Sequence, residues 1–374
     1  MILPSIFPDE LARGYLGRIC RLNGGSSPEA LRLSIERTVS ADLESPWDCS
    51  WVELLAAISN MPPAAFFVRH TMLPFTRAVR PERECFRHGS RGDALEGRAH
   101  TFPIGRKDPH HYFCPACVAE DLAFWGTSYW RRSHQLRAVV RCDKHALGLH
   151  QVANSKWMRM PHDELANSTP LPASVIEDAS QNPAITRYAE ICFALVERDI
   201  PVTTNQMVRT IRHQLENISA KSNCQRSRIS KLVIEKFQGP WQRHFFESLT
   251  AESGEQYAES FERTQSSINV GYATHFYALA LATLFDTADE AIENISRPTV
   301  KAVLNKMPSV GWGIPNMQLA AASTKTALTA AAQAFLAGAS IADACRAYGG
   351  DSNQLEALLR AAADPLRLEL KQLH

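Results

Sequence analysis

The sequence predicts a mostly α-helical protein with one small metal-binding domain in its first half. Apolar residues recur at three- and four-residue spacing in several segments. No segment shows the sustained two-residue alternation of a half-buried strand, so we expect few strands. Two cysteine or histidine pairs at ligand spacing lie close together in the chain, between residues 114 and 145. We therefore expect helix-turn-helix-like modules flanking a small zinc-finger domain, and a helical C-terminal region.

The composition is that of a globular protein with more than one domain. Its 374 residues are 45% hydrophobic and 21% charged, and at roughly 100–200 residues per domain we expect two to four domains. With a net charge of +1, contact with nucleic acid has to come from local basic surfaces. The N-terminus lacks the features of a signal peptide, and no apolar stretch approaches the ~20 residues of a membrane span. We expect a cytoplasmic protein whose clustered cysteines bind metal.

The first 100 residues predict a helical domain. Asp9 is placed to cap a helix after Pro8, with Tyr15 and Ile19 on its apolar face. Residues 51–58 predict a second helix, which the prolines after Met61 end, and residues 64–73 predict a third. This layout fits a helix-turn-helix, although many plain helical hairpins share it.

Residues 101–160 predict the zinc domain. Two residues separate Cys114 from Cys117, and two separate Cys142 from His145. This spacing suits a tight knuckle, in which two side chains reach one metal ion while backbone N–H groups point at the sulfur atoms. Two such pairs complete a tetrahedron of three sulfurs and one nitrogen, which is a common structural zinc set. We therefore expect one structural Zn²⁺.

Alternatives to this ligand set remain open. His134, His150 or His111 could replace His145, although only His145 has knuckle spacing from Cys142. Chance spacing of unrelated core cysteines is the remaining alternative. The 24 residues between the pairs include an apolar run that we expect to fold back as a small helix over the site. That run comprises Leu122, Phe124, Trp125, Tyr129 and Trp130.

A catalytic role for the metal is disfavoured. A catalytic zinc keeps one position open for water, whereas four good ligands close the shell here. His162 and Glu164 match the H-x-E of zinc deaminases, but the order of the motifs is reversed and no proline precedes Cys114. The chain also has no H-E-x-x-H and no P-loop. We expect no enzyme activity.

Beyond residue 160, a polar stretch with prolines at 161, 170, 172 and 183 predicts a linker. Helices are expected after it. Residues 184–198 and 274–285 predict apolar or amphipathic helices within a helical, basic region over residues 184–300. Residues 315–374 predict a second helix-turn-helix-like domain. Asn353 and Gln354 begin its candidate recognition helix, where amide side chains can read adenine edges. A structural or protein-binding hairpin is the alternative.

Residues 206–244 carry eight basic side chains against two acidic ones, with Phe237 and Trp241 among them. Such a surface can neutralise phosphates and bind nucleic acid without regard to sequence. The alternative is a solvated helix face. The candidate nucleic-acid contacts in this region are Arg209, Arg212, Arg226, Arg228, Lys231 and Arg243.

Three segments around the cysteines resemble the TniQ family: FCPACVAEDL at 113–122, YWRRSHQL at 129–136 and CDKHALGLH at 142–150. The opening also resembles this family, with Leu3-Pro4, then PDEL at 8–11 and YLGR at 15–18. The resemblance covers roughly the first 150 residues. Residues 271–285 are more loosely similar to a helical region of the longer relatives called TnsD.

The resemblance implies a non-catalytic adaptor that selects the target of DNA transposition. Members of the family bind attachment-site DNA or an RNA-guided CRISPR effector complex, and they engage an AAA+ ATPase that recruits the transposase. Relatives in RNA-guided complexes act as dimers, so the resemblance also allows this protein to form a homodimer. Cys114, Cys117, Cys142 and His145 match the motif positions of the zinc ligands.

The chain departs from many relatives in one respect, because no second cysteine cluster follows the first. A second finger, and any function specific to it, is therefore in doubt. Two alternative functions stay open beside the adaptor. One is a stand-alone zinc-containing DNA-binding regulator, and the more remote one is a zinc-dependent hydrolase or nuclease.

Overall fold

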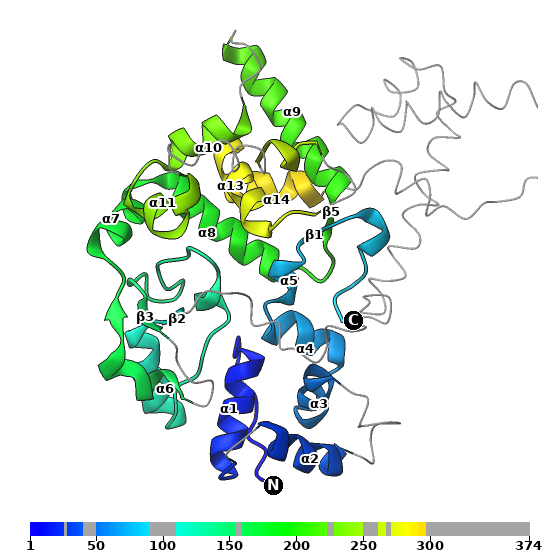
Figure 1. Cartoon of the computed structure of the whole chain (residues 1–374), viewed down its shortest axis with the longest axis vertical. Helices are drawn as coiled ribbons and strands as arrows, with labels where there is room; N and C mark the ends of the chain where they lie inside the picture. Colours follow the sequence, from blue (N-terminus) through cyan, green and yellow to red (C-terminus); the bar gives the residue numbers. More distant parts are fainter. Residues whose placement is uncertain are drawn as a thin grey trace, which may run out of the picture. The chain divides into compact units, whose positions relative to one another are not determined.

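The computed structural model (Figure 1) divides the chain into two units, residues 1–296 and 297–374. It describes residues 1–25, 28–39, 50–89, 110–153, 159–222, 228–249, 261–266 and 271–296. The predicted C-terminal helix-turn-helix, with Asn353 and Gln354, lies outside the described residues, as does Arg226. All of the described residues lie in the first unit.

Short helices form the N-terminal part of this unit. They are α1 (Ala12–Leu22), α2 (Pro28–Val39), α3 (Trp51–Ile58), α4 (Pro63–His70) and α5 (Leu73–Thr76). The predicted helix over residues 51–58 is confirmed, and a reciprocal capping box begins it. The backbone N–H of Glu53 donates to the Ser50 hydroxyl at 3.2 Å, and the Ser50 N–H donates to the Glu53 carboxylate at 2.7 Å.

The α3–α4 pair bends by 103° between Ile58 and Pro63. Helix-turn-helix motifs have angles of roughly 90–120°, so the geometry is compatible with that motif without being specific to it. Among the described residues, no single helix is long and apolar enough to cross a membrane, and α3 with α4 reaches the required length only as this bent pair.

A first hydrophobic core joins α1 to α4. Tyr15, Ile19, Ile35, Leu55 and Phe66 are all fully buried in it. The apolar spacing of α1 therefore predicts its buried face correctly.

The predicted cap of α1 is wrong. Leu11 occupies the N-cap position and makes no side-chain cap. Asp9 lies two residues earlier with a φ of 56°, and its carboxylate accepts hydrogen bonds from Arg132 and Ser133 instead. A long-range ion pair therefore replaces the local cap.

The cysteine region, residues 110–153 and 159–170, forms a second, small subdomain of the unit. Strands β2 (His110–Phe113), β3 (His150–Ala153) and β4 (Thr169–Pro170) make an antiparallel sheet in the order β2-β3-β4. Helix α6 (Pro115–Trp125) follows β2 directly, and the 3-10 helices η3 (Ser133–Gln135) and η4 (Pro161–Asn167) lie nearby in the chain. Phe113 is paired with His150, which places the two cysteine-bearing segments at one end of the sheet.

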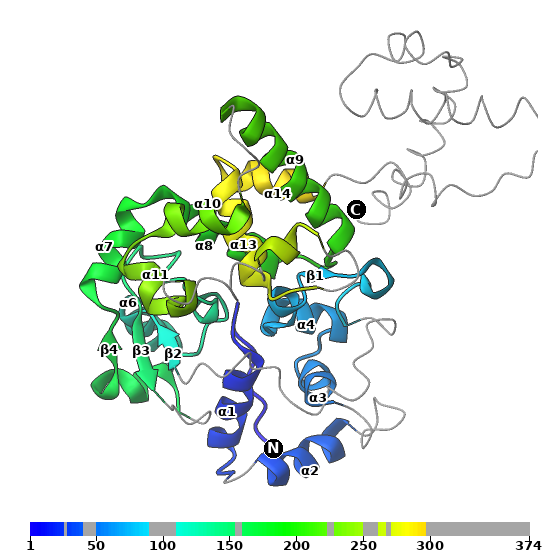
Figure 2. The same ribbon diagram turned by 45° about the horizontal axis from the view of Figure 1, so that its top comes forward.

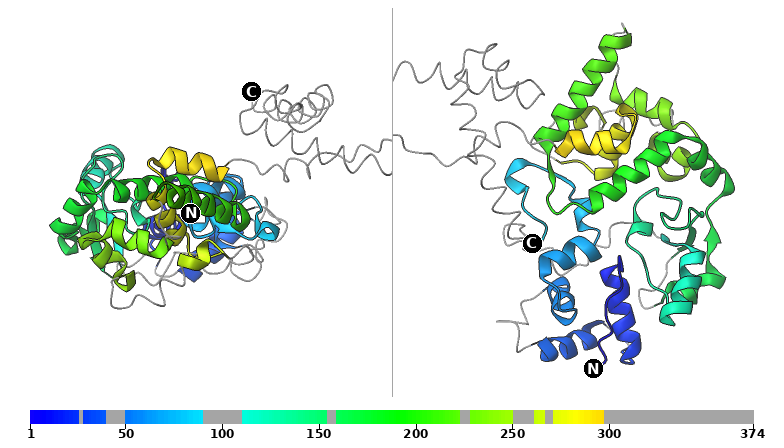
Figure 3. Two further views of the ribbon diagram at one scale, coloured as in Figure 1. Left: turned by 90° about the horizontal axis from the view of Figure 1, so that it is seen from above. Right: turned by 180° about the vertical axis from the view of Figure 1, so that it is seen from behind.

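Helices make up the rest of the unit, as Figure 3 shows in green and yellow, with the N-terminal helices in blue at the far end. They are α7 (Ala173–Gln181), α8 (Pro183–Val196), α9 (Thr204–Ser222), α10 (Ile229–Phe237), α11 (Pro240–Phe245), η5 (Glu247–Leu249), α13 (Thr274–Leu284) and α14 (Ala288–Ser296). The helices predicted over residues 184–198 and 274–285 are thus confirmed as α8 and α13. These helices share one large core with the cysteine region, in which Tyr188, Trp241 and Tyr277 are fully buried.

The stretch predicted as a linker is part of this core. Leu171, Val175 and Ala179 are buried in it, and the Asp178 carboxylate accepts the backbone N–H of Trp241 at 2.9 Å. Most of the prolines there mark the starts of helices, because Pro161 begins η4, Pro172 is the N-cap of α7 and Pro183 begins α8, whereas Pro170 lies in β4.

Short contacts join α5 to these later helices. Strand β1 (Val79–Arg80), which precedes η2 (Glu82–Glu84), pairs in parallel with β5 (Val202–Thr203). The Thr274 hydroxyl at the start of α13 donates to the carbonyl of Phe75 in α5. The end of the N-terminal part is therefore held against α13 and the segment before α9.

Arg132 joins the N-terminal helices to the second core. Its side chain is only 3% exposed. It donates to the Asp9 carboxylate at 3.0 Å, to the carbonyl of Val68 in α4, and to the carboxylate of Glu197 just after α8. One guanidinium thus connects three segments that are distant in sequence.

We predict that Arg132→Met destabilises the protein by about 2–3 kcal/mol. Breaking a buried pair costs roughly 3–5 kcal/mol, and the cost is lower here because the side chain of Glu197 is 63% exposed and stays hydrated. Urea unfolding measures the change. Glu197→Gln is the matched control and should cost under about 1 kcal/mol. Equal midpoints for Arg132→Met and the unsubstituted protein would contradict this role.

Candidate metal centre

The predicted zinc ligands lie on two turns that the sheet holds together. Cys114 is the N-cap of α6, and Cys117 lies in the first turn of that helix. Cys142 and His145 lie in the turn before β3, where the Cys142 N–H donates to the Leu147 carbonyl at 2.8 Å. The three cysteines are buried, and His145 is half-buried.

The distances between the four side chains fit one tetrahedral metal ion. His145 Nδ1 lies 3.6, 3.3 and 3.6 Å from the sulfurs of Cys114, Cys117 and Cys142, and the Cys117 and Cys142 sulfurs lie 3.6 Å apart. Metal–ligand bonds of about 2.3 Å to sulfur and 2.0–2.1 Å to nitrogen give edges of roughly 3.8 and 3.6 Å in a tetrahedron. The four residues could therefore hold a metal ion without rearrangement.

The other histidines considered from the sequence are not part of this set. His134 comes close to Cys142 and Asp143 but not to the remaining ligands. His150 Nδ1 contacts the Ser168 hydroxyl at 3.1 Å, and the ring of His111 packs on Trp130. Among the described residues, His145 alone brings a nitrogen to all three sulfurs.

Hydrogen bonds favour negative charge on the Cys142 sulfur, whereas burial raises the pKa of Cys114 and the hydrogen bond with Cys142 raises the pKa of Cys117. The N–H groups of Cys117 and Ala116 donate to the Cys114 sulfur, and that of His145 donates to the Cys142 sulfur. The pKa of Cys142 is held far below its ordinary value, first by the thiol of Cys117 and also by His134. Thiolates are the forms of cysteine that bind metal, so the electrostatics favour Cys142 as the first of the three thiols to lose its proton.

Glu120 holds the ring of His145, the candidate histidine ligand. It lies on α6, and its Oε1 is 2.9 Å from His145 Nε2, while its Oε2 pairs with Lys144. The hydrogen bonds from Lys144 and then His145 lower the pKa of Glu120. Because a carboxylate accepts the proton of Nε2, Nδ1 is left unprotonated and free to bind the metal.

One part of the sequence prediction around the site is wrong. Leu122, Phe124 and Trp125 do belong to a helix, but the side chain of Phe124 is 77% exposed and that of Trp125 is 48% exposed. Tyr129 and Trp130 are buried outside the helix. The end of helix α6 therefore presents exposed apolar side chains to solvent instead of covering the metal site.

The family model of TniQ matches residues 1–149. The predicted resemblance is thereby confirmed for this part of the chain. No curated protein matches the chain.

The motifs of the TniQ region are neighbours in space. Arg132 N donates to the Asp9 carbonyl at 2.9 Å, and Leu11 N donates to the Trp130 carbonyl at 2.8 Å. The opening motif therefore packs along the segment that follows α6. A Cβ at Gly14 would come within 3.3 Å of Trp130, so this glycine allows α1 to approach closely.

Two further ion pairs of the TniQ region were not singled out from the sequence. Arg18 donates to the buried Glu10 carboxylate at 3.0 and 2.7 Å, and Arg131 donates to Asp121 at 2.7 and 2.9 Å. Glu120 was also missed, although its place three residues after Cys117 puts it on the same helix face. That spacing is the one sequence signal that could have found it.

The candidate nucleic-acid contacts beyond the TniQ region do not gather on one helix. Arg209 and Arg212 are exposed on α9, Arg228 and Lys231 at the start of α10, and Arg243 on α11. Helix α10 lies between α9 and α11 in Figures 1 and 2.

The aromatic residues of that region do not contribute to a surface. Phe237 and Trp241 are fully buried and stack on each other, so they belong to the core. Lys231 pairs weakly with Glu235, at 3.8 Å. The region therefore offers exposed arginines without the interleaved aromatic rings that base stacking would need.

We predict that Glu120→Gln loosens metal binding by roughly 10–100-fold, as removal of such an orienting carboxylate does elsewhere. Release of the metal to a chromogenic chelator measures the effect. Lys144→Met is the matched control, because it removes the other partner of Glu120 and leaves the contact with His145. Similar release rates for both variants would show that Glu120 does not orient the ligand.

Proposed function

We propose that the protein is a non-catalytic target-selection adaptor for DNA transposition. The observation that carries this proposal is the TniQ match over residues 1–149. In this role the protein binds target DNA or an RNA-guided effector complex and recruits the transposon AAA+ ATPase and transposase. The domains proposed for it span residues 1–100, 101–160, 184–300 and 315–374, with helix-turn-helix modules in the first and last.

We propose zinc as the metal. Three thiolates and one imidazole in a tetrahedron are the donor set that Zn²⁺ prefers in structural sites. Cys114, Cys117, Cys142 and His145 would hold it, and bound zinc would crosslink α6 to the turn before β3. The four protein ligands leave no position for water, which supports a scaffold and not a hydrolytic centre.

The surface of the TniQ region supports contact with proteins. The C-terminal end of α6 exposes Leu122, Phe124 and Trp125, and the rings of Phe124 and Trp125 contact each other with centroids 4.5 Å apart. Exposed clusters of this kind mark interaction sites more often than isolated apolar residues do. This favours an adaptor over a stand-alone DNA-binding regulator. Contact with DNA through the arginines of α9 to α11 stays a proposal.

The purified protein should hold close to one zinc ion per chain. Cys114→Ser should lose it and unfold the cysteine region, because metal binding and folding are coupled at such sites. Elemental analysis measures the content. Cys85→Ser is the matched control, because the Cys85 thiol donates to the Arg80 carbonyl at 3.3 Å, far from the ligands in sequence, and a hydroxyl can do the same. A content of zero or two in the unsubstituted protein would contradict the proposal.

A reconstituted transposition reaction tests the adaptor role. Without this protein, the ATPase fused to a foreign DNA-binding domain should direct insertion to the foreign site, because bridging acts through effective concentration. Sequencing of the insertion sites measures the outcome, and the unfused ATPase is the control. Failure of the fusion despite confirmed occupancy of the foreign site would show that this protein also activates its partner and is not a simple bridge.

A further inference from the structure

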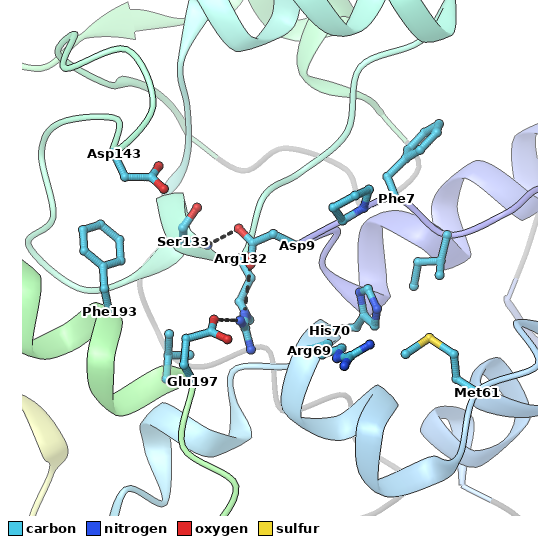
Figure 4. Close-up of a pocket in the computed structure, with 13 residues that line it drawn as sticks. Phe7, Asp9, Met61, Arg69, His70, Arg132, Ser133, Asp143, Phe193 and Glu197 are labelled. Carbon is cyan, nitrogen blue, oxygen red and sulfur yellow. Dashed lines mark hydrogen bonds and ion pairs between the residues drawn. The ribbon is translucent and has the colours of Figure 1, made fainter. Parts of the chain in front are cut away.

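A pocket of about 780 Å³ opens where the N-terminal segment, the TniQ cysteine region and α8 meet (Figure 4). Its size falls within the roughly 300–1,000 Å³ of ligand-binding pockets. Apolar side chains from three segments line it, namely Ile6, Met61 and Phe193. Neither the metal centre nor the proposed contacts with DNA make use of this pocket.

The charges in the middle of the pocket are already paired. Arg132 lies there between Asp9 and Glu197 (Figure 4). Both oxygens of Asp9 accept hydrogen bonds, one from Arg132 and one from the Ser133 N–H at 3.0 Å. The charged groups in this part of the lining already pair with one another, so they are not available to pair with a ligand.

One basic and one acidic side chain, neither with an ion-pair partner among the described residues, lie on opposite sides of Arg132. Arg69 is exposed on α4 and Asp143 is exposed next to Cys142. Neither forms an ion pair within the described residues; the carboxylate of Asp143 accepts from the Cys142 thiol at 3.9 Å, and His134 lies close to it. Figure 4 shows Asp143 beside Phe193 on one side, and Arg69 beside His70 and Met61 on the other.

His70 adds a directed acceptor on the Arg69 side. Its Nδ1 lies 2.8 Å from the Glu10 carbonyl, and since a carbonyl only accepts, Nδ1 carries the proton. Burial also lowers the pKa of His70, which favours the neutral ring. Its Nε2 is then an acceptor that a backbone or side-chain N–H can meet.

We propose that this pocket binds an extended peptide segment of a partner protein, in which an acidic and a basic residue flank an apolar one. The acidic residue pairs with Arg69, the basic residue with Asp143, and the apolar side chain lies between Met61 and Phe193. The proposal depends on the proposed adaptor function in one respect only, because the partner protein of the adaptor would supply the peptide. Its test below does not involve transposition, so the two can fail separately.

Nucleic acid fits the pocket less well than a peptide does. The lining holds three carboxylates, from Asp9, Asp143 and Glu197, against the guanidiniums of Arg69 and Arg132. Arg132 is neutralised by its partners, so a phosphate backbone would meet a net negative surface. A peptide with charges of both signs avoids this repulsion.

Selection from a random heptapeptide display library on the full-length protein tests the proposal. We expect enriched peptides to carry an acidic and a basic residue on opposite sides of an apolar one. A labelled peptide from the selection should bind Arg69→Glu and Asp143→Lys at least ten-fold more weakly, as fluorescence polarisation measures. Selection on Arg69→Glu should replace the acidic residue by a basic one.

The control is Arg83→Glu, because the side chain of Arg83 is 81% exposed and does not line the pocket. The affinity of this variant for the peptide should equal that of the unsubstituted protein. Metal content and thermal midpoint verify that each variant is folded. If Asp143→Lys loses metal, Asp143→Asn takes its place. Failure to enrich any peptide, equal binding by Arg69→Glu, or displacement of the peptide by a single-stranded oligonucleotide would overturn the proposal.

Discussion

The buried guanidinium of Arg132 is the constraint on which the arrangement of the described unit depends. A buried charge is tolerated only where partners replace its lost hydration. Asp9, the Val68 carbonyl and Glu197 are those partners, and they come from the N-terminal segment, α4 and the end of α8. The three segments therefore have to converge for Arg132 to be buried at all. This requirement positions the first hydrophobic core relative to the second more specifically than apolar contact would.

The metal centre extends the same chain of contacts. Gln135 pairs with both backbone groups of Tyr112 in β2, at 3.1 and 2.7 Å, and Arg131 makes a bidentate pair with Asp121 in α6. The segment around Arg132 is thus attached to the strand before Cys114 and to the helix that carries Cys117. A metal ion that holds these cysteines also holds the segment against which the N-terminus packs. This explains in physical terms why the TniQ motifs, far apart in sequence, describe one structural unit.

The features that sequence predicted well depend on local spacing. The clustering of the four candidate metal ligands and the helices α3, α8 and α13 follow from residue periods that the backbone imposes. The failures depend on competition between distant partners. Asp9 is a good helix cap, but Arg132 and Ser133 bind its carboxylate instead. The prolines before α8 suggest a linker, yet proline also suits the first turn of a helix, as at Pro161 and Pro183. Apolar content likewise does not distinguish the buried Trp241 from the exposed Phe124.

The same scaffold positions the groups that remain available for binding. Asp143 directly follows the ligand Cys142, so a metal ion that holds this cysteine also limits where the carboxylate can lie. Arg69 directly precedes His70, whose ring is held by the Glu10 carbonyl, and Glu10 adjoins the Asp9 that pairs with Arg132. Both unpaired charges of the pocket are therefore one residue away from a fixed side chain. The backbone at both positions is thus ordered before a ligand binds, so binding has to order only the two side chains, which lowers the entropic cost of selective binding.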